Sequence, residues 1–304
     1  EQLSTQFPVI SVEVQVAANT PFGDYTIRLQ SNSGEIAYVP GAITIDPAAG
    51  TALPSPVDDA RFFINQNYSD LTGREADQLT VEKLLTQFAL CGNKADCLRT
   101  RRVDFSAGLF LETDLPANGV FLHGLYTAGL GRRPKFAEFD SDRAALANHN
   151  GDVERSRMAF LLNFVQRQEF KRRHAATIKA PEFVDSVLAS IVQNAGVDLS
   201  SDRAALIALV DESAASRAAV LAKVIGHPAV IDAQYNQSLI LFHYFAYLRR
   251  DPDESGYATW INFINGKPLR DADTARSVTC GFVNSSEYQN RFGLLTPHEP
   301  RECN

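Results

Sequence analysis

One register of residues recurs along this chain. An apolar residue is followed five positions later by a tyrosine and six positions after that by an arginine. Three copies align without a gap: Phe63, Tyr68, Arg74; Phe121, Tyr126, Arg132; Leu239, Tyr244, Arg250. A fourth copy, at Phe183, Leu188 and Asn194, keeps only the apolar pair. Because each unit can bury its apolar face only against its neighbours, the register predicts one continuous array of about four helical units.

The last unit, residues 239–293, shows what one unit contains. Residues 239–248 are apolar on every side, which predicts a central helix surrounded by packed neighbours. AspProAsp at 251–253 supplies a turn and an N-cap, and the residues after it have the spacing of a one-sided helix. AsnGlyLysPro at 265–268 ends that helix, and two more helices follow as far as Phe292.

Aromatic residues at corresponding places in the units are predicted to form the core. They are Phe63, Tyr68, Phe121, Tyr126, Tyr244, Trp260, Phe164 and Phe282. Trp260 is the only tryptophan, and its place on a one-sided helix favours core packing over stacking on a sugar. The arginines that follow the tyrosines are expected to leave the helix ends, where they bind carbonyls or pair with an acidic residue of the same unit.

A family resemblance follows from three motifs. The tyrosine and arginine register, the ArgAspProAspGluSerGlyTyrAlaThrTrp turn at 250–260 and the PheVal…GluTyr…ArgPheGly ending resemble the bacterial domain-of-unknown-function family 4214. The resemblance is most complete at 239–293, less so at 121–173 and 63–115, and weakest at 183–230. It implies an all-α fold, a bacterial source and an exported or surface-layer protein, with distant similarity to phycobilisome linker domains. It implies no catalytic residues, because the family has no established activity.

The N-terminal segment has a different period. Apolar and polar residues alternate at 9–16, 25–30, 35–39 and 42–45, which predicts strands joined by the turns ThrProPheGlyAsp and AsnSerGly. The string AlaAsnThrProPheGlyAspTyrThrIleArgLeuGln resembles the C-terminal half of an immunoglobulin-like sandwich of the IPT type, which is common in bacterial surface proteins.

Three or four strands leave an apolar face that a second sheet would have to cover, and that sheet is not in the sequence. We therefore expect the β-segment to be completed from outside the chain: either it packs on a neighbouring subunit by strand addition, which is favoured, or it is the remnant of a longer polypeptide whose upstream strands were removed. The candidate assembly edge consists of Val12, Val14, Val16, Tyr25, Ile27 and Leu29, and Ile43 and Ile45 extend the same face.

The predicted fold class is mainly α: tandem helical repeats with a small N-terminal β-sheet that forms part of an immunoglobulin-like sandwich. The expected domains are a partial immunoglobulin-like domain at 1–46, a Pro- and Ala-rich linker at 47–56, and a helical repeat domain at 57–304 with units near 57–118, 119–176, 177–235 and 236–304.

Four cysteines are placed in two groups. Cys91 and Cys97 close a small polar loop, and Cys280 can reach Cys303 near the end of the chain. The even number and the loop-closing spacing predict disulfides Cys91 to Cys97 and Cys280 to Cys303, which suit an oxidising compartment. The alternatives are a zinc site, which normally needs a gap of two to four residues between paired thiolates, and four free thiols.

Length and charge restrict the partners. A chain of 304 residues, 45% of them hydrophobic, can bury a sizeable core. A net charge of −7 with a pI near 5.4 argues against nucleic acid and an anionic membrane surface, since both need a basic footprint. No apolar run approaches the roughly 18 residues of a membrane span, so membrane insertion is not expected.

One short motif mimics a metal site. Asp251, Asp253 and Ser255 stand at positions 1, 3 and 5 of a calcium loop, but position 12 is Asn262 rather than glutamate. Pro252 also suits a helix start, so a capping turn is favoured over calcium. The histidines show no ligand spacing, and no nucleophile elbow or phosphate loop is present, so we expect no cofactor and no catalytic residue.

These observations favour a non-catalytic structural or assembly protein of a bacterial cell surface: a subunit or fragment of an array, filament or adhesin. Its expected partner is itself or another surface protein. The first alternative is a module of a larger secreted protein that binds glycan or protein on the concave side of the array. The second is a secreted enzyme of unrecognised type, which would need a polar pocket with convergent titratable groups.

Overall fold

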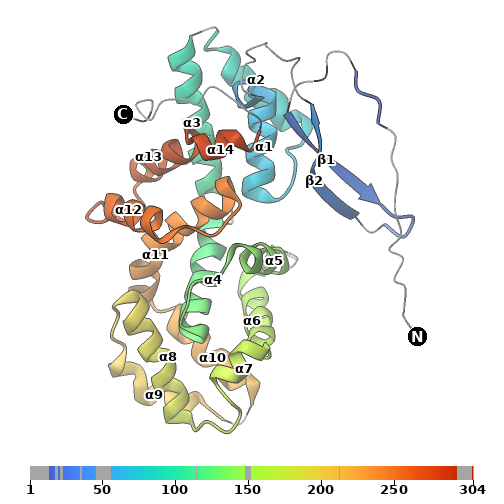
Figure 1. The fold of residues 1–304 in the computed structure, drawn as a ribbon. Coiled ribbons are helices and arrows are strands. Elements are labelled where there is room, and N and C mark those ends of the chain that lie inside the picture. Colours follow the sequence, from blue (N-terminus) through green and yellow to red (C-terminus); the bar gives the residue numbers. More distant parts are fainter. Residues whose placement is uncertain are drawn as a thin grey trace.

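A computed structural model describes residues 14–17, 20, 23–34, 36–45, 56–92, 94–113, 115–147, 152–211, 213–292 and 303. Over these residues the protein is mainly helical, which confirms the predicted class (Figure 1). The helices are α1 (Ala60–Thr72), α2 (Gln78–Ala89), α3 (Ala95–Glu112), α4 (Leu115–Leu130), α5 (Phe136–Ala147), α6 (Val153–Phe164), α7 (Gln168–Arg173), α8 (Ala180–Ala195), α9 (Arg203–Leu209), α10 (Ala214–Ile225), α11 (Pro228–His243), α12 (Glu254–Ile264), α13 (Ala272–Val283) and α14 (Ser286–Asn290).

Helices α4 and α11 pack along each other at the centre of the helical body (Figure 1). Every residue from Leu239 to Tyr247 is buried, which confirms the predicted central helix. Its final turn, Tyr244–Leu248, is π-helical. The expected unit boundary between 235 and 236 lies inside α11, because this helix already begins at Pro228, and the boundary between 118 and 119 lies inside α4.

Aspartates begin many of the helices. In α1, α2, α6, α12 and α13 the N-cap carboxylate accepts a backbone N–H from the first helical turn: Asp59, Asp77, Asp152, Asp253 and Asp271. A cap of this kind contributes about 1 kcal/mol to helix stability. The capping turn predicted at Asp253 is confirmed, and Asp77 makes the corresponding turn before α2.

The turns after the long first helices share a left-handed residue. Gly73, Gly131 and Gly196 follow α1, α4 and α8 with φ of 69°, 69° and 67°. Glycine suits this conformation because it has no Cβ to clash with the backbone. After the π-helical turn the same conformation is adopted by Arg249, with φ 55°.

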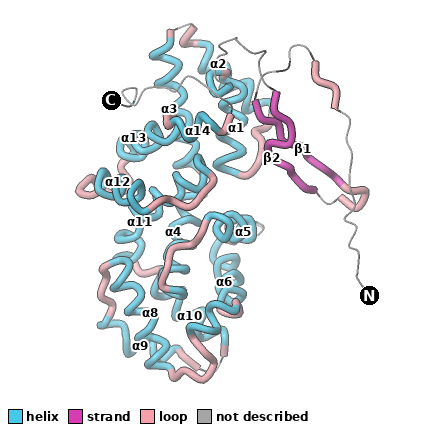
Figure 2. Tube along the Cα trace, in the orientation of Figure 1, coloured by secondary structure: helices cyan, strands magenta, loops and turns pink. Residues whose placement is uncertain are grey.

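Strands β1 (Gly23–Gln30) and β2 (Ile36–Ile45) form an antiparallel hairpin at the periphery of the helical body (Figure 2). Tyr25 pairs with Ile43 and Ile27 with Val39, so three residues of β2 face one residue of β1 between these pairs. Pro40 lies in this irregular part, as expected for a residue without an N–H for the ladder. The strands expected at 35–39 and 42–45 are therefore one bulged strand.

The strand predicted at 9–16 is wrong where the structure describes it. Residues 14–17 form no strand, and 9–13 lie outside the described residues. Alternation predicts a strand only if a partner supplies the ladder, and the described sheet has only β1 and β2. The remainder of the expected immunoglobulin-like sandwich is not seen among the described residues.

Among the described helices, none is by itself long and apolar enough to cross a membrane. The segments Ala214–Ile225 and Pro228–Leu248 meet the criteria of length and hydropathy when they are taken together, but they meet at a bend of 74°.

Candidate functional site

Both predicted disulfides are confirmed. Cys91 is bonded to Cys97 with a Cα separation of 5.4 Å, and Cys280 is bonded to Cys303 with a Cα separation of 5.6 Å. Both separations lie within the range that a disulfide allows. The second bond ties α13 to a residue close to the C-terminal end of the sequence. All four cysteines of the sequence are used in this way.

In the second copy of the register, the tyrosine ring and the arginine pack together with a phenylalanine and two glutamates. Tyr126 is buried and meets Phe164 of α6 edge-on, with ring centroids 5.3 Å apart. Arg132 lies over the Tyr126 ring at 5.2 Å and binds both carboxylate oxygens of Glu169, at 2.8 and 2.7 Å. The same guanidinium also binds Glu138. These contacts join the end of α4 to α5, α6 and α7.

The last copy repeats these contacts. Tyr244 meets Phe282 of α13 edge-on with centroids 5.0 Å apart, and Arg250 lies over the Tyr244 ring at 5.3 Å. Arg250 binds both carboxylate oxygens of Glu287, which is 37 residues further along the chain. Glu169 also lies 37 residues after Arg132. The predicted pairing of the arginine with an acid of its own unit is confirmed in both copies.

The first copy departs from this arrangement. Tyr68 is half-buried and lies against Phe105 with centroids 6.3 Å apart. Arg74 has no acid at the corresponding place, because the residue 37 positions later is Leu111. The contacts of Arg74 within the described chain are backbone bonds to the Thr72 hydroxyl.

The remaining predicted core residues differ in burial. Phe63 is buried, whereas Phe121 and Trp260 are half-buried and pack against the core. The Trp260 ring is stacked on Phe282 with centroids 5.1 Å apart and an interplanar angle of 26°. A Cβ added at Gly281 would overlap the same indole. One face of the indole is thus occupied by protein, which supports the packing role over the sugar-stacking alternative.

Two buried ion pairs connect distant helices. Asp70 of α1 binds Arg291, beyond α14, through both carboxylate oxygens at 2.9 and 2.8 Å. Burial raises the pKa of Asp70, whereas Arg291 acts in the opposite direction. Asp142 accepts two bonds from Arg167, at 2.9 and 2.6 Å, and one from the Tyr126 hydroxyl at 2.8 Å. Burial, followed by the Asp142 charge, raises the pKa of Tyr126.

Three histidines are buried and neutral. His243 donates from Nδ1 to the Leu239 carbonyl at 2.8 Å, and its Nε2 accepts from Thr279 at 3.0 Å. Burial lowers the pKa of His243 and of His174 to about 4 and that of His123 to about 3. These side chains serve as hydrogen-bonded parts of the core and stay uncharged at neutral pH.

The calcium candidate is used for capping. Asp253 accepts from the Gly256 N–H and from the Ser255 hydroxyl, both at 2.8 Å. Asp251 accepts from the Phe136 N–H at 2.7 Å, so it caps the beginning of α5 instead of facing Asp253. Nowhere in the described part of the chain do three His, Cys, Asp or Glu side chains gather as metal ligands would.

The candidate assembly edge is divided by the structure. Val14 and Val16 are 47% and 52% exposed and lie outside the sheet. Ile27 and Leu29 alternate with polar residues on β1 and are half-buried, as is Tyr25. Val12 lies outside the described residues.

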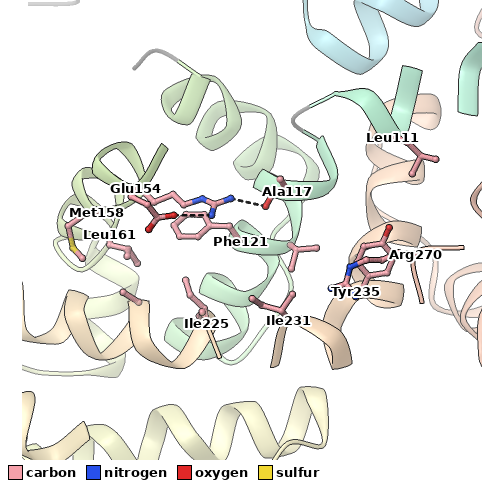
Figure 3. A pocket seen from close by; sticks show the side chains of 14 residues that line it. Leu111, Ala117, Phe121, Glu154, Met158, Leu161, Ile225, Ile231, Tyr235 and Arg270 are labelled. Carbon is pink, nitrogen blue, oxygen red and sulfur yellow. Dashed lines mark hydrogen bonds and ion pairs between the residues drawn. The ribbon is translucent and has the colours of Figure 1, made fainter. Parts of the chain in front are cut away.

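A cleft of about 680 Å³ opens between α4, α6, α10 and α11 (Figure 3). Its walls include Phe121 of α4, Met158 and Leu161 of α6, Ile225 of α10 and Ile231 of α11. Its volume lies within the roughly 300 to 1,000 Å³ that is typical of small-molecule sites. Its mainly apolar lining is also typical of such sites. It was not foreseen from the sequence, because its walls come from four helices that are separated along the chain.

Comparisons with protein-family models, curated proteins and solved structures find no match for this chain.

Proposed function

We propose that this chain is a non-catalytic structural or assembly protein of the bacterial cell exterior, built from tandem helical repeats. In this proposal the N-terminal hairpin joins the protein to a second copy of itself or to another surface protein. The observation that carries the proposal is the hairpin: within the described residues it is a sheet of two strands at the periphery, with a half-exposed apolar face. Such a sheet offers unpaired backbone groups for strand addition.

The contacts within the helical body support the repeat part of the proposal. The clusters around Tyr126 and Tyr244 share an edge-on phenylalanine, an arginine over the ring and a glutamate 37 residues after that arginine. Duplication of one unit explains the agreement of these three contacts more simply than chance does. On this basis α4–α7 and α11–α14 are two copies, and α1–α3 and α8–α10 are more divergent ones.

The disulfides support the extracellular part of the proposal. Disulfides persist in oxidising compartments and are rare in the cytosol. All four cysteines of this chain are in disulfides, and the bond from Cys280 links Cys303 to α13. The buried acids and histidines are engaged in bonds between or within helices, which supports an architectural use of these residues over a catalytic one.

The test is the assembly state of the full chain and of a form without residues 1–50. We expect the truncated form to keep its helical circular dichroism and the fluorescence of Trp260, and to lose the oligomeric mass and morphology of the full chain. Native mass spectrometry and negative-stain imaging measure both. If the truncated protein keeps the mass and shape of the full one, the hairpin is not the contact and the proposal fails.

Point variants make the test local. Ile27→Asp places a charge on the half-buried apolar face of β1 and is expected to weaken assembly in the full-length chain. Leu79→Asp is the control, because it places the same single charge on an apolar residue of α2 that is 80% exposed and lies outside the hairpin. Equal effects of the two changes would show that general surface hydrophobicity, and not the hairpin, drives association.

A further inference from the structure

The cleft between α4, α6, α10 and α11 has an apolar interior and two arginines at its edge. Its charged lining residues are Arg157, Arg270 and Glu154. The Glu154 side chain is 87% exposed, so it is well hydrated and screens little. The edge therefore presents two arginines, of which Arg270 is held by Asp232 at 2.8 Å while Arg157 has its nearest acid at 3.6 Å.

Arg157 has unused hydrogen-bonding capacity. Its Nη2 donates to the Ala117 carbonyl at 3.2 Å, and the guanidinium lies over the Phe121 ring at 5.0 Å. Its Nη1 is 3.6 Å from Glu154, which is longer than a hydrogen bond. Its Nε is buried without a hydrogen-bond partner among the described residues. Nη1, which has no acceptor within hydrogen-bond distance, is therefore the donor that a carboxylate can reach, and the Phe121 ring holds the plane of the guanidinium.

Arg270 supplies a second cation on the opposite wall. It lies over Tyr235 at 4.9 Å (Figure 3). It is also bonded to Asp232 at 2.8 Å. Its backbone has φ 60°, a left-handed conformation that L-residues rarely adopt. Because Arg270 already has an acidic partner and Arg157 has only a distant one, the anion of a ligand is expected at Arg157.

We propose that this cleft binds an amphiphile with one aliphatic chain and one carboxylate, a ligand of the fatty-acid class. The carboxylate binds the Arg157 guanidinium, and the chain lies along Met158, Leu161, Ile225 and Ile231. Burial of the aliphatic chain against this apolar lining supplies most of the binding free energy. Methionine suits such a wall because its flexible thioether adapts to chains of different length.

The probe is decanoate, compared with decanol, which has the same chain and no charge. Met158 is the only methionine, so its ¹³C-methyl NMR signal reports on the cleft without assignment of other residues. We expect decanoate to shift this signal in a saturable manner below its micellar concentration. Decanol is expected to bind at least about tenfold more weakly, because it lacks the charge-assisted hydrogen bond. Trp260 does not line the cleft, so its fluorescence should stay unchanged.

Three variants separate the parts of the proposal. Arg157→Gln should raise the dissociation constant of decanoate about tenfold and leave that of decanol unchanged. Arg155→Gln is the matched control on the same helix, since Arg155 is 86% exposed and outside the cleft, and it should bind as the parent protein does. Ala222→Phe should fill the cleft and abolish both shifts. Circular dichroism establishes that each variant is folded.

Three results would overturn the proposal. The first is the absence of a saturable Met158 shift with decanoate. The second is equal binding of decanoate by the parent protein and by folded Arg157→Gln, which would show that the arginine holds no anion. The third is unchanged binding by folded Ala222→Phe, which would place the ligand elsewhere.

Discussion

Acidification should unfold this protein through its buried histidines. In the folded state the pKa of His243 and of His174 is about 4 and that of His123 about 3, because burial disfavours the charged form. In the unfolded chain each pKa returns to about 6.5. The folded pKa is the lower one, so the stabilisation is complete above about pH 6.5 and is lost as the pH falls through the window down to the folded value.

The magnitude follows from the width of the window. Between pH 6.5 and pH 5 each histidine protonates only in the unfolded chain, over about 1.5 pH units at 1.36 kcal/mol per unit. Each therefore lowers the free energy of unfolding by about 2 kcal/mol, and the three together by about 6 kcal/mol. This is comparable with the total stability of a typical domain, about 5 to 15 kcal/mol. Asp70, whose pKa is raised by burial, acts in the opposite direction, because the folded state then takes up the proton.

Urea unfolding at pH 7 and pH 5 without reductant measures the effect, with circular dichroism as the signal. We expect the midpoint to fall sharply at pH 5. In His243→Gln the difference in unfolding free energy between the two pH values should shrink by about 2 kcal/mol. A difference below about 1 kcal/mol in the parent protein, or one that His243→Gln leaves unchanged, would refute the assignment of the histidines as buried neutral groups.

The other predictions concern packing and the C-terminal bond. Tyr244→Ala should lower the free energy of unfolding by about 3 kcal/mol, and a change below about 0.5 kcal/mol would place the ring at the surface. Tyr68→Ala should lower the free energy of unfolding by less, because Tyr68 is only half-buried. Cys303→Ser opens a loop with a sequence separation of 23 and should cost about 3 kcal/mol, measured against the parent protein without reductant. Gly281→Ala forces a Cβ into the Trp260 ring and should cost about 1 to 3 kcal/mol, whereas Gly108→Ala, with open space around it, should stabilise α3 by about 0.5 to 1 kcal/mol in the same urea assay; equal effects would contradict the packing.

Local chemistry was readable from the sequence. The cap at Asp253 and the end of α12 depend on residues within a few positions, and the register located Tyr244 correctly because an aromatic residue is needed wherever the same contact recurs. The pairing of Asp70 with Arg291 was not readable, because these residues lie 221 positions apart and neither has a local motif. The extra strand at 9–16 was predicted from alternation alone, which contains no information on the partner strand.

On the proposed duplication, the contacts between α4–α7 and α11–α14 explain why their sequences differ at the turns. On the proposed register Arg133 corresponds to Asp251 and Phe136 to Glu254, counted from the arginines of the register. The two turns meet: the Phe136 N–H donates to Asp251 at 2.7 Å, and Arg133 forms an ion pair with Glu254. Exchanging the two units converts one of these contacts into the other, so the turns meet in the manner of a twofold, isologous interface.

Two identical turns could not make this interface equally well. Two copies of the second unit would place Arg133 against Phe136, and two copies of the last would place Asp251 against Glu254, which repel each other. Only the pairing of one turn of each kind combines a cation with an anion. Arg249 adds to the same junction, because it lies over Phe136 at 4.9 Å while it occupies a left-handed position that glycine fills after α4. On the proposed duplication, the difference between the turns specifies which units pack together, while the contacts shared by the two tyrosine clusters maintain each unit.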